Sequence, residues 1–313
     1  MYFPLILFIQ LQEKFLRVGN MKVKGAKVGF IGLGLMGRSM AHNLLKATGD
    51  LSVYTRTKDS AAAILKEGAQ WEENPAAVAR KSDIVFTIVG YPKDVEEVYF
   101  GENGLIDAAH AGTILVDMTT SSPSLAKRIF DAASEKGLEA LDAPVSGGDI
   151  GARNGTLSIM CGGNEKIFDT VLPFFKELGK TFTLMGEAGA GQNTKAANQI
   201  LVAANLFGTV EAIRYAELVN LEPEKLLQAL STGAAGSWQF VNNGKKIADK
   251  DFEPGFFVKH FLKDLNIALE VAQEEMLNLP MLELARDTFA AVNEKGFSNA
   301  GTQVLYEYYK QYL

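Results

Sequence analysis

Residues 27–37 read Lys-Val-Gly-Phe-Ile-Gly-Leu-Gly-Leu-Met-Gly, and this stretch decides the fold. A short β-rich apolar run, from Lys27 to Ile31, leads directly into a Gly-x-Gly-x-x-Gly turn, and a helical pattern begins at Gly37. Strand, turn and helix in this order are typical of a dinucleotide-binding unit, whereas the glycine pattern alone could be a structural turn.

Each glycine of this turn has a separate task in such a unit. Gly32 permits a tight turn, Gly34 lets a pyrophosphate approach the backbone, and Gly37 lets the helix pack closely on the strand. Leu35 and Met36 lie just before the helix, whose N-terminus is expected to supply amide donors and a positive dipole to the phosphates. These five residues are the predicted phosphate-binding site.

Outward from this turn, β-rich apolar runs alternate with helical patterns as far as about residue 184. The runs cover residues 27–31, 51–54, 84–89, 113–117, 138–141 and 156–160, and helical segments between them include 37–46, 60–67, 123–136 and 165–178. This alternation predicts a mostly parallel sheet with helices on both faces, which is an α/β fold of Rossmann type.

The β pattern stops after Gly186. Helical signals then cover residues 191–220, 222–230, 257–275 and 279–294, and Pro254-Gly255 separates two of them. We therefore predict an N-terminal extension at residues 1–20, a NAD(P)-binding Rossmann domain at 21–188, and an all-helical domain for substrate binding and dimerisation at 189–313.

Composition favours small-molecule chemistry. The chain has 313 residues, 47% of them hydrophobic, and a net charge of -6, so it lacks the basic surface expected of a protein that binds nucleic acid or anionic membranes. The apolar run at residues 3–9 is shorter than the roughly 20 residues that span a bilayer, although an amphipathic membrane anchor is an alternative. The single cysteine, Cys161, fits a cytoplasmic protein, and we expect it to be a buried strand residue rather than a reactive thiol.

The end of the second predicted strand bears on the choice of cofactor. An NAD site usually has Asp or Glu about 20 residues beyond the glycine turn, where it binds the ribose 2′-hydroxyl. This chain has Thr55, Arg56 and Thr57 there and no acid. A guanidinium suits a 2′-phosphate, so we expect NADP(H) in preference to NAD(H). The alternatives are that Arg56 stacks on adenine or points to solvent.

A second glycine-rich segment, Asp-Ala-Pro-Val-Ser-Gly-Gly at residues 142–148, follows the strand that ends near Leu141. It presents consecutive backbone amides beside the hydroxyl of Ser146, with Gly147 and Gly148 next, and such a turn can hold a carboxylate. Its place at the carboxyl edge of the predicted sheet favours ligand binding over a purely structural turn.

Lys195 carries the only formal charge on its helix before Glu211. Polar residues at 195, 198, 205 and 209 share one stripe, and the apolar residues around them predict a helix that is buried nearly all round. A buried ammonium is costly unless a nearby group needs it, so Lys195 is a candidate proton donor. The alternative is a side chain that reaches solvent at the helix start.

Four motifs together resemble the β-hydroxyacid dehydrogenase family. They are Gly-Phe-Ile-Gly-Leu-Gly-Leu-Met-Gly at 29–37, Asp-Ala-Pro-Val-Ser-Gly-Gly at 142–148, Gly-Ala-Gly-Gln-Asn-Thr-Lys-Ala-Ala-Asn at 189–198 and Lys-Asp-Leu at 263–265. In combination they are specific, and they occur in the family's order. The resemblance implies a NAD(P)-dependent oxidoreductase and a homo-oligomer.

The resemblance also implies roles for single residues. Lys195 matches the family's catalytic lysine, and Ser146, Gly147 and Gly148 match the loop that binds the substrate carboxylate. Asn198 and Gln199 match substrate contacts. Thr120, Lys263, and Val89 with Gly90 match positions that contact the cofactor. Many members have a second asparagine where this chain has Gln199, and the Asn-Gln form looks like the tartronate semialdehyde reductase branch. Both amides could instead form hydrogen bonds between helices.

The expected reaction is hydride exchange between the nicotinamide and a small 3-hydroxy or 2-hydroxy acid, with Lys195 transferring the proton. The expected substrate is tartronate semialdehyde (2-hydroxy-3-oxopropionate) or a 3-hydroxyisobutyrate-type acid. A decarboxylating relative would have an acid two turns beyond the lysine, where this chain has Val202, so we expect no decarboxylation. The alternatives are a related imine reductase, which typically lacks the lysine, and an NADP-binding sensor without turnover. Because the histidines lie in separate regions, we expect no metal site.

Overall fold

The computed structural model describes residues 22–312. The predicted N-terminal extension, with its alternative interpretation as a membrane anchor, lies outside these residues. The chain divides into two compact units, and the division falls between Lys195 and Ala196, within one long helix. Each unit is described by itself below.

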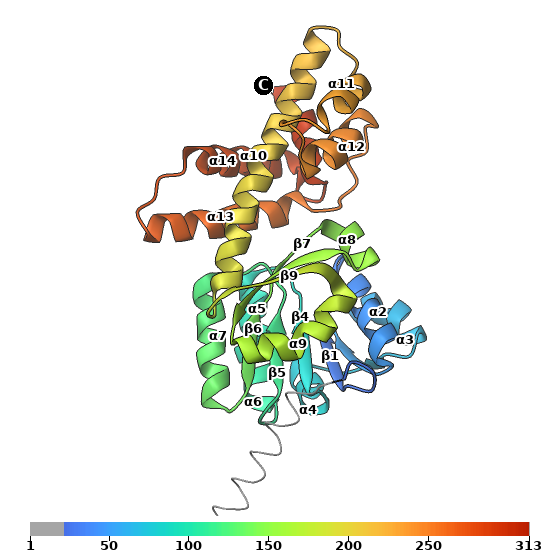
Figure 1. Cartoon of the computed structure of the whole chain (residues 1–313), viewed down its shortest axis with the longest axis vertical. Coiled ribbons are helices and arrows are strands. Elements are labelled where there is room, and N and C mark those ends of the chain that lie inside the picture. The colour runs from blue at the N-terminus through green and yellow to red at the C-terminus, as the bar shows by residue number, and fades with distance from the viewer. Residues whose placement is uncertain (1–21, 313) are drawn as a thin grey trace, which may run out of the picture. The chain divides into compact units, whose positions relative to one another are not determined.

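The first unit is built on one sheet whose central strands are parallel (Figure 1). The strands are β1 (Val28–Ile31), β2 (Leu51–Tyr54), β3 (Gln70–Trp71), β4 (Ile84–Thr87), β5 (Ile114–Asp117), β6 (Glu139–Asp142), β7 (Val145–Ser146), β8 (Leu157–Gly163) and β9 (Gly179–Gly186). Their order is β3-β2-β1-β4-β5-β6-β8-β7, and β9 pairs with β8. Strands β1 to β6 pair in parallel, whereas β8 is antiparallel to β6 and β7. The predicted Rossmann-type α/β fold is confirmed.

Helices cover both faces of this sheet. They are α2 (Gly37–Thr48), the short 3₁₀ turn η1 (Lys58–Ala61), α3 (Ala62–Lys66), α4 (Pro75–Lys81), α5 (Pro92–Phe100), α6 (Leu105–Ala108), α7 (Pro123–Glu135), α8 (Gly148–Asn154) and α9 (Glu165–Leu178). Side-chain caps fix the N-termini of two helices. The Asn74 side chain accepts a hydrogen bond from the Ala77 amide at α4, and the Ser122 side chain accepts one from the Leu125 amide at α7. A proline follows each of these two caps, at the position where its missing N–H costs nothing.

Alternate strand residues fill two separate cores. Phe30 and Phe86 belong to the core under α2 and α9, where Phe86 lies 6.2 Å from Phe174 between ring centroids. Their neighbours Ile31 and Val85 point to the opposite core, under α4 to α7. Strands buried on both faces read as continuous apolar runs, which is why they stand out in the sequence. Cys161 of β8 is fully buried, as predicted, and burial raises the pKa of its thiol.

As far as residue 312, where the described part ends, the second unit is helical apart from one isolated bridge between Phe257 and Gly301. Its elements are the greater part of α10 (Ala190–Leu218), then α11 (Pro223–Leu230), a π-helical turn η2 (Gln239–Asn243), α12 (Gly244–Ala248), α13 (Val258–Glu274), α14 (Pro280–Val292), a second π-helical turn η3 (Asn293–Phe297), a 3₁₀ turn η4 (Thr302–Val304) and α15 (Leu305–Tyr312). Phe261 and Phe289 meet edge to face in its core, with ring centroids 4.8 Å apart.

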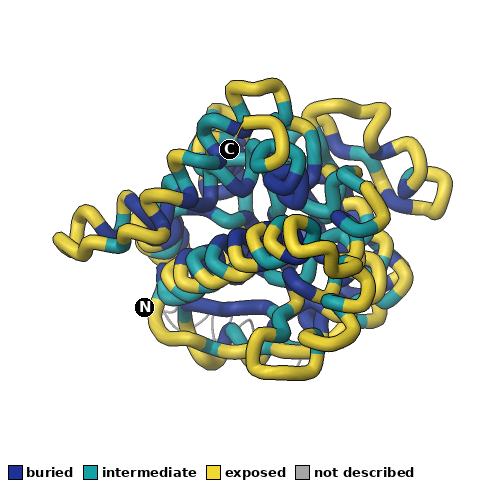
Figure 2. Tube along the Cα trace, turned by 90° about the horizontal axis from the view of Figure 1, so that it is seen from above, coloured by how far each residue is buried: buried dark blue, intermediate teal, exposed yellow. Residues whose placement is uncertain are grey.

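The prediction that the lysine-bearing helix is buried nearly all round is wrong. On α10, Leu201 is 65% exposed and Tyr215 is 66% exposed, and Asn205 is also exposed. Buried and exposed residues alternate along the helices of the chain (Figure 2). Among the described helices, α10 is the one that is long and apolar enough to cross a membrane. Core helices of soluble proteins pass the same test, and α10 contributes Leu206 and Val210 to the core of its unit.

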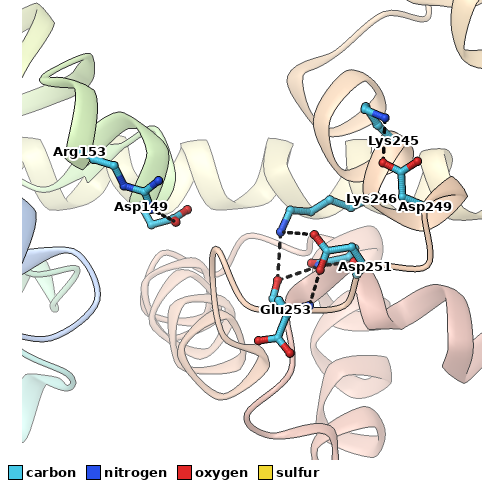
Figure 3. A network of polar contacts seen from close by, with 8 residues as sticks. Asp149, Arg153, Lys245, Lys246, Asp249, Asp251 and Glu253 are labelled. Atoms are coloured by element: carbon cyan, nitrogen blue, oxygen red, sulfur yellow. Dashed lines mark hydrogen bonds and ion pairs between the residues drawn. The ribbon is translucent and has the colours of Figure 1, made fainter.

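The loop between α12 and α13 contains the predicted Pro254-Gly255 break, and polar contacts hold it in place (Figure 3). Lys246 pairs with the Asp251 carboxylate at 3.2 Å and donates to the Glu253 carbonyl oxygen at 3.1 Å. In the first unit, Figure 3 also shows the pair of Asp149 and Arg153, which closes one turn of α8. These pairs are partly open to solvent, so they fix local geometry and contribute little to overall stability.

Candidate active site

The three glycines of the turn between β1 and α2 differ in their surroundings. Gly32 has a φ of +100°, and a Cβ there would lie 2.0 Å from the Ile88 carbonyl oxygen. At Gly37, a Cβ would lie 1.9 Å from the Gly32 carbonyl oxygen. Packing within the protein itself therefore requires glycine at both positions.

Gly34 is the exception, because it is exposed and a Cβ there would meet no atom within 4 Å. The described residues give no steric reason for glycine at this position, so the space beside it suits a ligand. Leu35 and Met36 follow, and the N-cap Met36 supplies no side-chain cap to α2. An anion here could accept hydrogen bonds from the backbone amides at the start of α2, and the helix dipole would favour its negative charge. The turn thus fits the pyrophosphate of a dinucleotide.

Arg56 lies just beyond β2, where the sequence predicts a group for the ribose. Its Nη1 donates to the Asp94 Oδ1 at 2.9 Å, and the Arg56 side chain is 77% exposed. Asp94 belongs to the first turn of α5, and its other oxygen accepts the Tyr91 amide at 3.1 Å. Thr55 is half-buried and Thr57 is exposed beside Arg56. The guanidinium is thus anchored at one nitrogen and accessible to solvent.

The loops that follow β4 and β5 are joined by a hydrogen bond. The Val89 amide donates to the Thr119 hydroxyl at 3.0 Å. The predicted cofactor contacts Val89, Gly90 and Thr120 are half-buried. Because β1, β4 and β5 are adjacent parallel strands, these loops lie at the same sheet edge as the glycine turn. The strand order reverses between β1 and β4, and ligands of such sheets bind at that point.

Two buried carboxylates, Asp117 and Asp142, lie at the ends of β5 and β6. Burial raises the pKa of Asp117 to about 6, although hydrogen bonds from Thr119 and Thr87 oppose the shift. Burial also raises the pKa of Asp142, and backbone amides of Gly189 and Gln192 oppose that shift. Both residues end a strand. Asp117 accepts a hydrogen bond from the Thr119 amide in the loop that follows β5, and Asp142 accepts hydrogen bonds from amides at the start of α10.

The predicted carboxylate-binding loop begins at β7 and leads into α8. Ser146 is half-buried, and Gly147 and Gly148 have φ values of +132° and +65°. Two consecutive positive φ values are rare in residues other than glycine, because a Cβ would strain the backbone. The local sequence therefore produces a sharp turn beside a hydroxyl group, at the same sheet edge as the loops after β4 and β5.

Lys195 is only 7% exposed, and its Nζ donates to the Val145 carbonyl oxygen at 2.8 Å. Val145 immediately precedes Ser146, so the amine lies next to the chain that forms the carboxylate-binding loop. A lysine amine at this place can exchange a proton with a substrate held by that loop. The structure thus brings together two of the predicted functional elements, the lysine and the loop around Ser146.

In the second unit, four polar side chains form one continuous chain of contacts. Asn198 donates to the Gln199 side-chain oxygen at 2.8 Å, and Gln199 donates to Asp264 at 2.6 Å. Asp264 in turn pairs with Lys263 at 2.7 Å. Gln199 therefore bonds α10 to α13, as the helix-to-helix alternative expects. Its substrate contact, like the roles of Asn198 and Lys263, stays a prediction.

Sequence reasoning missed three residues that shape this region: Asp94, Asp117 and Gln192. Asp94 carried a usable signal, since an acid three residues after a helix N-cap commonly bonds the cap amide. Gln192 lies about one helical turn before Lys195, which places it near the same face of α10. Asp117 ends a buried strand, but its partners are distant in the sequence.

Two family models match the chain in succession. The NAD-binding domain of 6-phosphogluconate dehydrogenase matches residues 27–186, and the NAD-binding domain of NADP-dependent 3-hydroxyisobutyrate dehydrogenase matches residues 189–309. Both descriptions name NAD binding, so the cofactor is a nicotinamide dinucleotide.

Similar proteins cover nearly the whole described chain. An uncharacterised oxidoreductase of Bacillus subtilis is 50% identical over 90% of this chain and 97% of its own length. The 2-hydroxy-3-oxopropionate reductase of Escherichia coli is 44% identical over 87% of this chain and 93% of its own. A solved 3-hydroxyisobutyrate dehydrogenase of Mycobacterium tuberculosis has a TM-score of 0.82 at 26% identity, covering 90% of this chain and 98% of that one. The chain is an oxidoreductase that acts on CH–OH groups, and it belongs to the β-hydroxyacid dehydrogenase family.

Proposed function

We propose that the chain is an NADP(H)-preferring 3-hydroxyacid dehydrogenase that works as a semialdehyde reductase, with 2-hydroxy-3-oxopropionate (tartronate semialdehyde) as its substrate. The observation that carries the proposal is the placement of the buried Lys195 amine, 2.8 Å from the Val145 carbonyl oxygen beside the loop of Ser146. The E. coli relative is named for this substrate, and the Asn198-Gln199 pair, which resembles that branch of the family, supports the same assignment. A 3-hydroxyisobutyrate-type acid is the second candidate, because the second family model carries that name.

In the reducing direction, negative charge develops on the carbonyl oxygen of the substrate. The Lys195 ammonium, a group with three N–H donors, donates the proton that neutralises this oxygen. In the oxidising direction the neutral amine accepts the hydroxyl proton. The bound nicotinamide dinucleotide supplies or accepts the hydride. Ser146 and the amides of Gly147 and Gly148 orient the substrate through its carboxylate, which fixes the carbonyl that reacts.

We propose that the substrate keeps its carboxylate throughout. A decarboxylating relative would need an acid two helical turns after the lysine, and this chain has Val202 there. Val202 is partly buried and packs against the hydrophobic core of the second unit. A side chain in that environment offers no group for proton transfer to a carbanion.

Steady-state assays with purified protein test the proposed reaction directly. The panel contains tartronate semialdehyde, methylmalonate semialdehyde, succinic semialdehyde and glyoxylate, each with NADPH and with NADH. We expect the highest kcat/KM for tartronate semialdehyde with NADPH and no release of carbon dioxide. Carbon dioxide among the products would contradict the mechanism. NADPH binding without turnover of any semialdehyde would instead indicate a sensor, and reduction of an imine alone would indicate an imine reductase.

Arg56 provides the test of cofactor preference. We expect Arg56→Gln to lower kcat/KM for NADPH by about 10- to 100-fold, because a hydrogen bond to a charged group contributes roughly 1.5–3 kcal/mol. The value for NADH should change less than about threefold, since NADH lacks the 2′-phosphate. The measurement is kcat/KM with each cofactor at saturating substrate.

Arg128→Gln is the matched control, because Arg128 also forms an ion pair with a carboxylate on α5, that of Glu96. It should leave both cofactors unaffected. Equal losses with NADPH and NADH in Arg56→Gln would show that Arg56 contacts the adenosine common to both cofactors, and the preference for NADP(H) would lose its basis.

A further inference from the structure

We propose that Gln192 is a positioning residue that fixes the loop of residues 119–121 relative to the helix of Lys195. The inference rests on the proposed role of Lys195 in proton transfer. Gln192 is 1% exposed and lies in the first turn of α10. It has no part in the motif roles assigned above, and all of its contacts described below lie within the first unit.

Both the nitrogen and the oxygen of the Gln192 side-chain amide form hydrogen bonds with one loop. Its Nε2 donates to the Thr119 carbonyl oxygen at 2.7 Å, and its Oε1 accepts the Ser121 amide at 2.9 Å. These two backbone groups flank Thr120, the predicted cofactor contact. A primary amide supplies one donor and one acceptor in a single plane, which neither a carboxylate nor an apolar side chain of the same length can do.

The backbone of Gln192 ties the same turn to the end of β6. Its amide donates to Asp142 Oδ2 at 2.8 Å, and the Gly189 amide donates to Asp142 Oδ1 at 2.7 Å. Asp142 thus caps the start of α10. Three residues after Asp142, the Val145 carbonyl accepts the bond from Lys195. One hydrogen-bonded network therefore joins the segment from the end of β6 to Val145 with the first turns of α10.

The Gln192 side chain connects that hydrogen-bonded network to the loop after β5. The loop is also held from its other side, because Asp117 accepts the Thr119 amide at 3.0 Å and the Thr119 hydroxyl accepts the Val89 amide. Asp117 and Thr119 are buried, and hydrogen bonds in a low-dielectric interior resist rearrangement. The position of the proton-transferring amine relative to the cofactor loop thus depends on the Gln192 amide. A misplacement of about 1 Å in such an arrangement costs on the order of 10²-fold in rate.

The test compares Gln192→Met with Gln192→Glu. Methionine keeps the length and removes both hydrogen bonds, whereas glutamate keeps an acceptor for Ser121 and loses the donor to Thr119. At saturating NADPH and substrate, we expect kcat to fall by about 10- to 100-fold in Gln192→Met and at least tenfold in Gln192→Glu. The KM for substrate should change less than about threefold, because the carboxylate-binding loop is intact. Should the methionine variant fail to fold, the glutamate variant decides the question.

Gln303→Met is the matched control. Gln303 is a buried glutamine of the second unit whose Nε2 donates to the carbonyl oxygens of Asp251 and Glu253, so it has a purely structural task of the same kind. It should lower the melting temperature and leave kcat within about twofold of the wild type. If Gln192→Met lowers the melting temperature equally and also leaves kcat unchanged, Gln192 is structural only and the proposal is wrong.

A double variant separates this proposal from the proposed function. If Gln192 acts through Lys195, then Gln192→Met should lower kcat by less than about threefold in a Lys195→Met background, because residues that act as a unit are not additive. Independent, multiplicative losses would overturn the positioning role while leaving Lys195 in place. Full activity in Lys195→Met alone would instead overturn the proposed function.

Discussion

Replacing Lys195 by methionine is expected to lower kcat for semialdehyde reduction by about 10² to 10⁴-fold, the usual contribution of a positioned general acid or base. Methionine has nearly the same length and volume as lysine, and the site is buried, so packing is preserved. The Val145 carbonyl loses the donor that reaches it at 2.8 Å, but the side chains of the phosphate-binding turn are untouched. NADPH affinity should therefore change little. Stopped-flow or steady-state kinetics give kcat, and fluorescence titration gives the Kd for NADPH.

Two further variants test the same role. Lys195→Arg should be about as inactive as Lys195→Met, because a guanidinium stays protonated and has a different shape. Lys176→Met, which removes an exposed lysine from the last turn of α9, should leave kcat unchanged. If Lys195→Met retained more than about one tenth of the wild-type kcat, proton transfer by this residue would be excluded.

Changing two glycines of the same turn to alanine should have opposite consequences. Gly34→Ala is expected to fold normally, because a Cβ at Gly34 meets no atom within 4 Å. It should weaken NADPH binding by about 10- to 100-fold, because the methyl group occupies the space proposed for the pyrophosphate, and overpacking costs roughly 1–3 kcal/mol. The measurements are the melting temperature without cofactor and the Kd for NADPH.

Gly37→Ala should instead destabilise the protein itself. Its Cβ would lie 1.9 Å from the Gly32 carbonyl oxygen, so α2 must move away from β1. We expect a loss of about 2–4 kcal/mol in the free energy of unfolding, measured by denaturant titration without cofactor. If Gly34→Ala bound NADPH as tightly as the wild type, the turn would have no role in phosphate binding.

Much of the first unit was predictable because its signals are local in the chain. The glycine turn, the apolar strands buried on both faces and the proline-marked helix starts each depend on residues within a few positions of one another. The sequence also separated the sheet from the helical part. It did not predict the exposure of Leu201 and Tyr215 on α10, because an apolar residue on a helix says nothing about whether another element covers it.

The candidate site divides in the same way. Gly32, Gly34 and Gly37 are recognisable from spacing alone, and Lys195 stands out as an isolated charge on an apolar helix. The partners of Arg56 and Gln199 were not predictable, since Asp94 and Asp264 lie 38 and 65 positions away in the sequence. As a result of these contacts, one guanidinium nitrogen of Arg56 is already hydrogen-bonded to Asp94, and the Gln199 amide joins α10 to α13.

By itself, the sequence determined the Rossmann-type fold and the nicotinamide dinucleotide cofactor, and it marked Lys195 as the candidate proton donor. Only the tertiary structure decided which groups hold that lysine in place. The Lys195 amine reaches Val145 across 50 positions, and Gln192 reaches Ser121 and Thr119 across 71 and 73 positions. The physical reason is that a sequence pattern records local conformation, whereas these bonds exist only after the sheet has brought the ends of β5 and β6 to one edge beside α10.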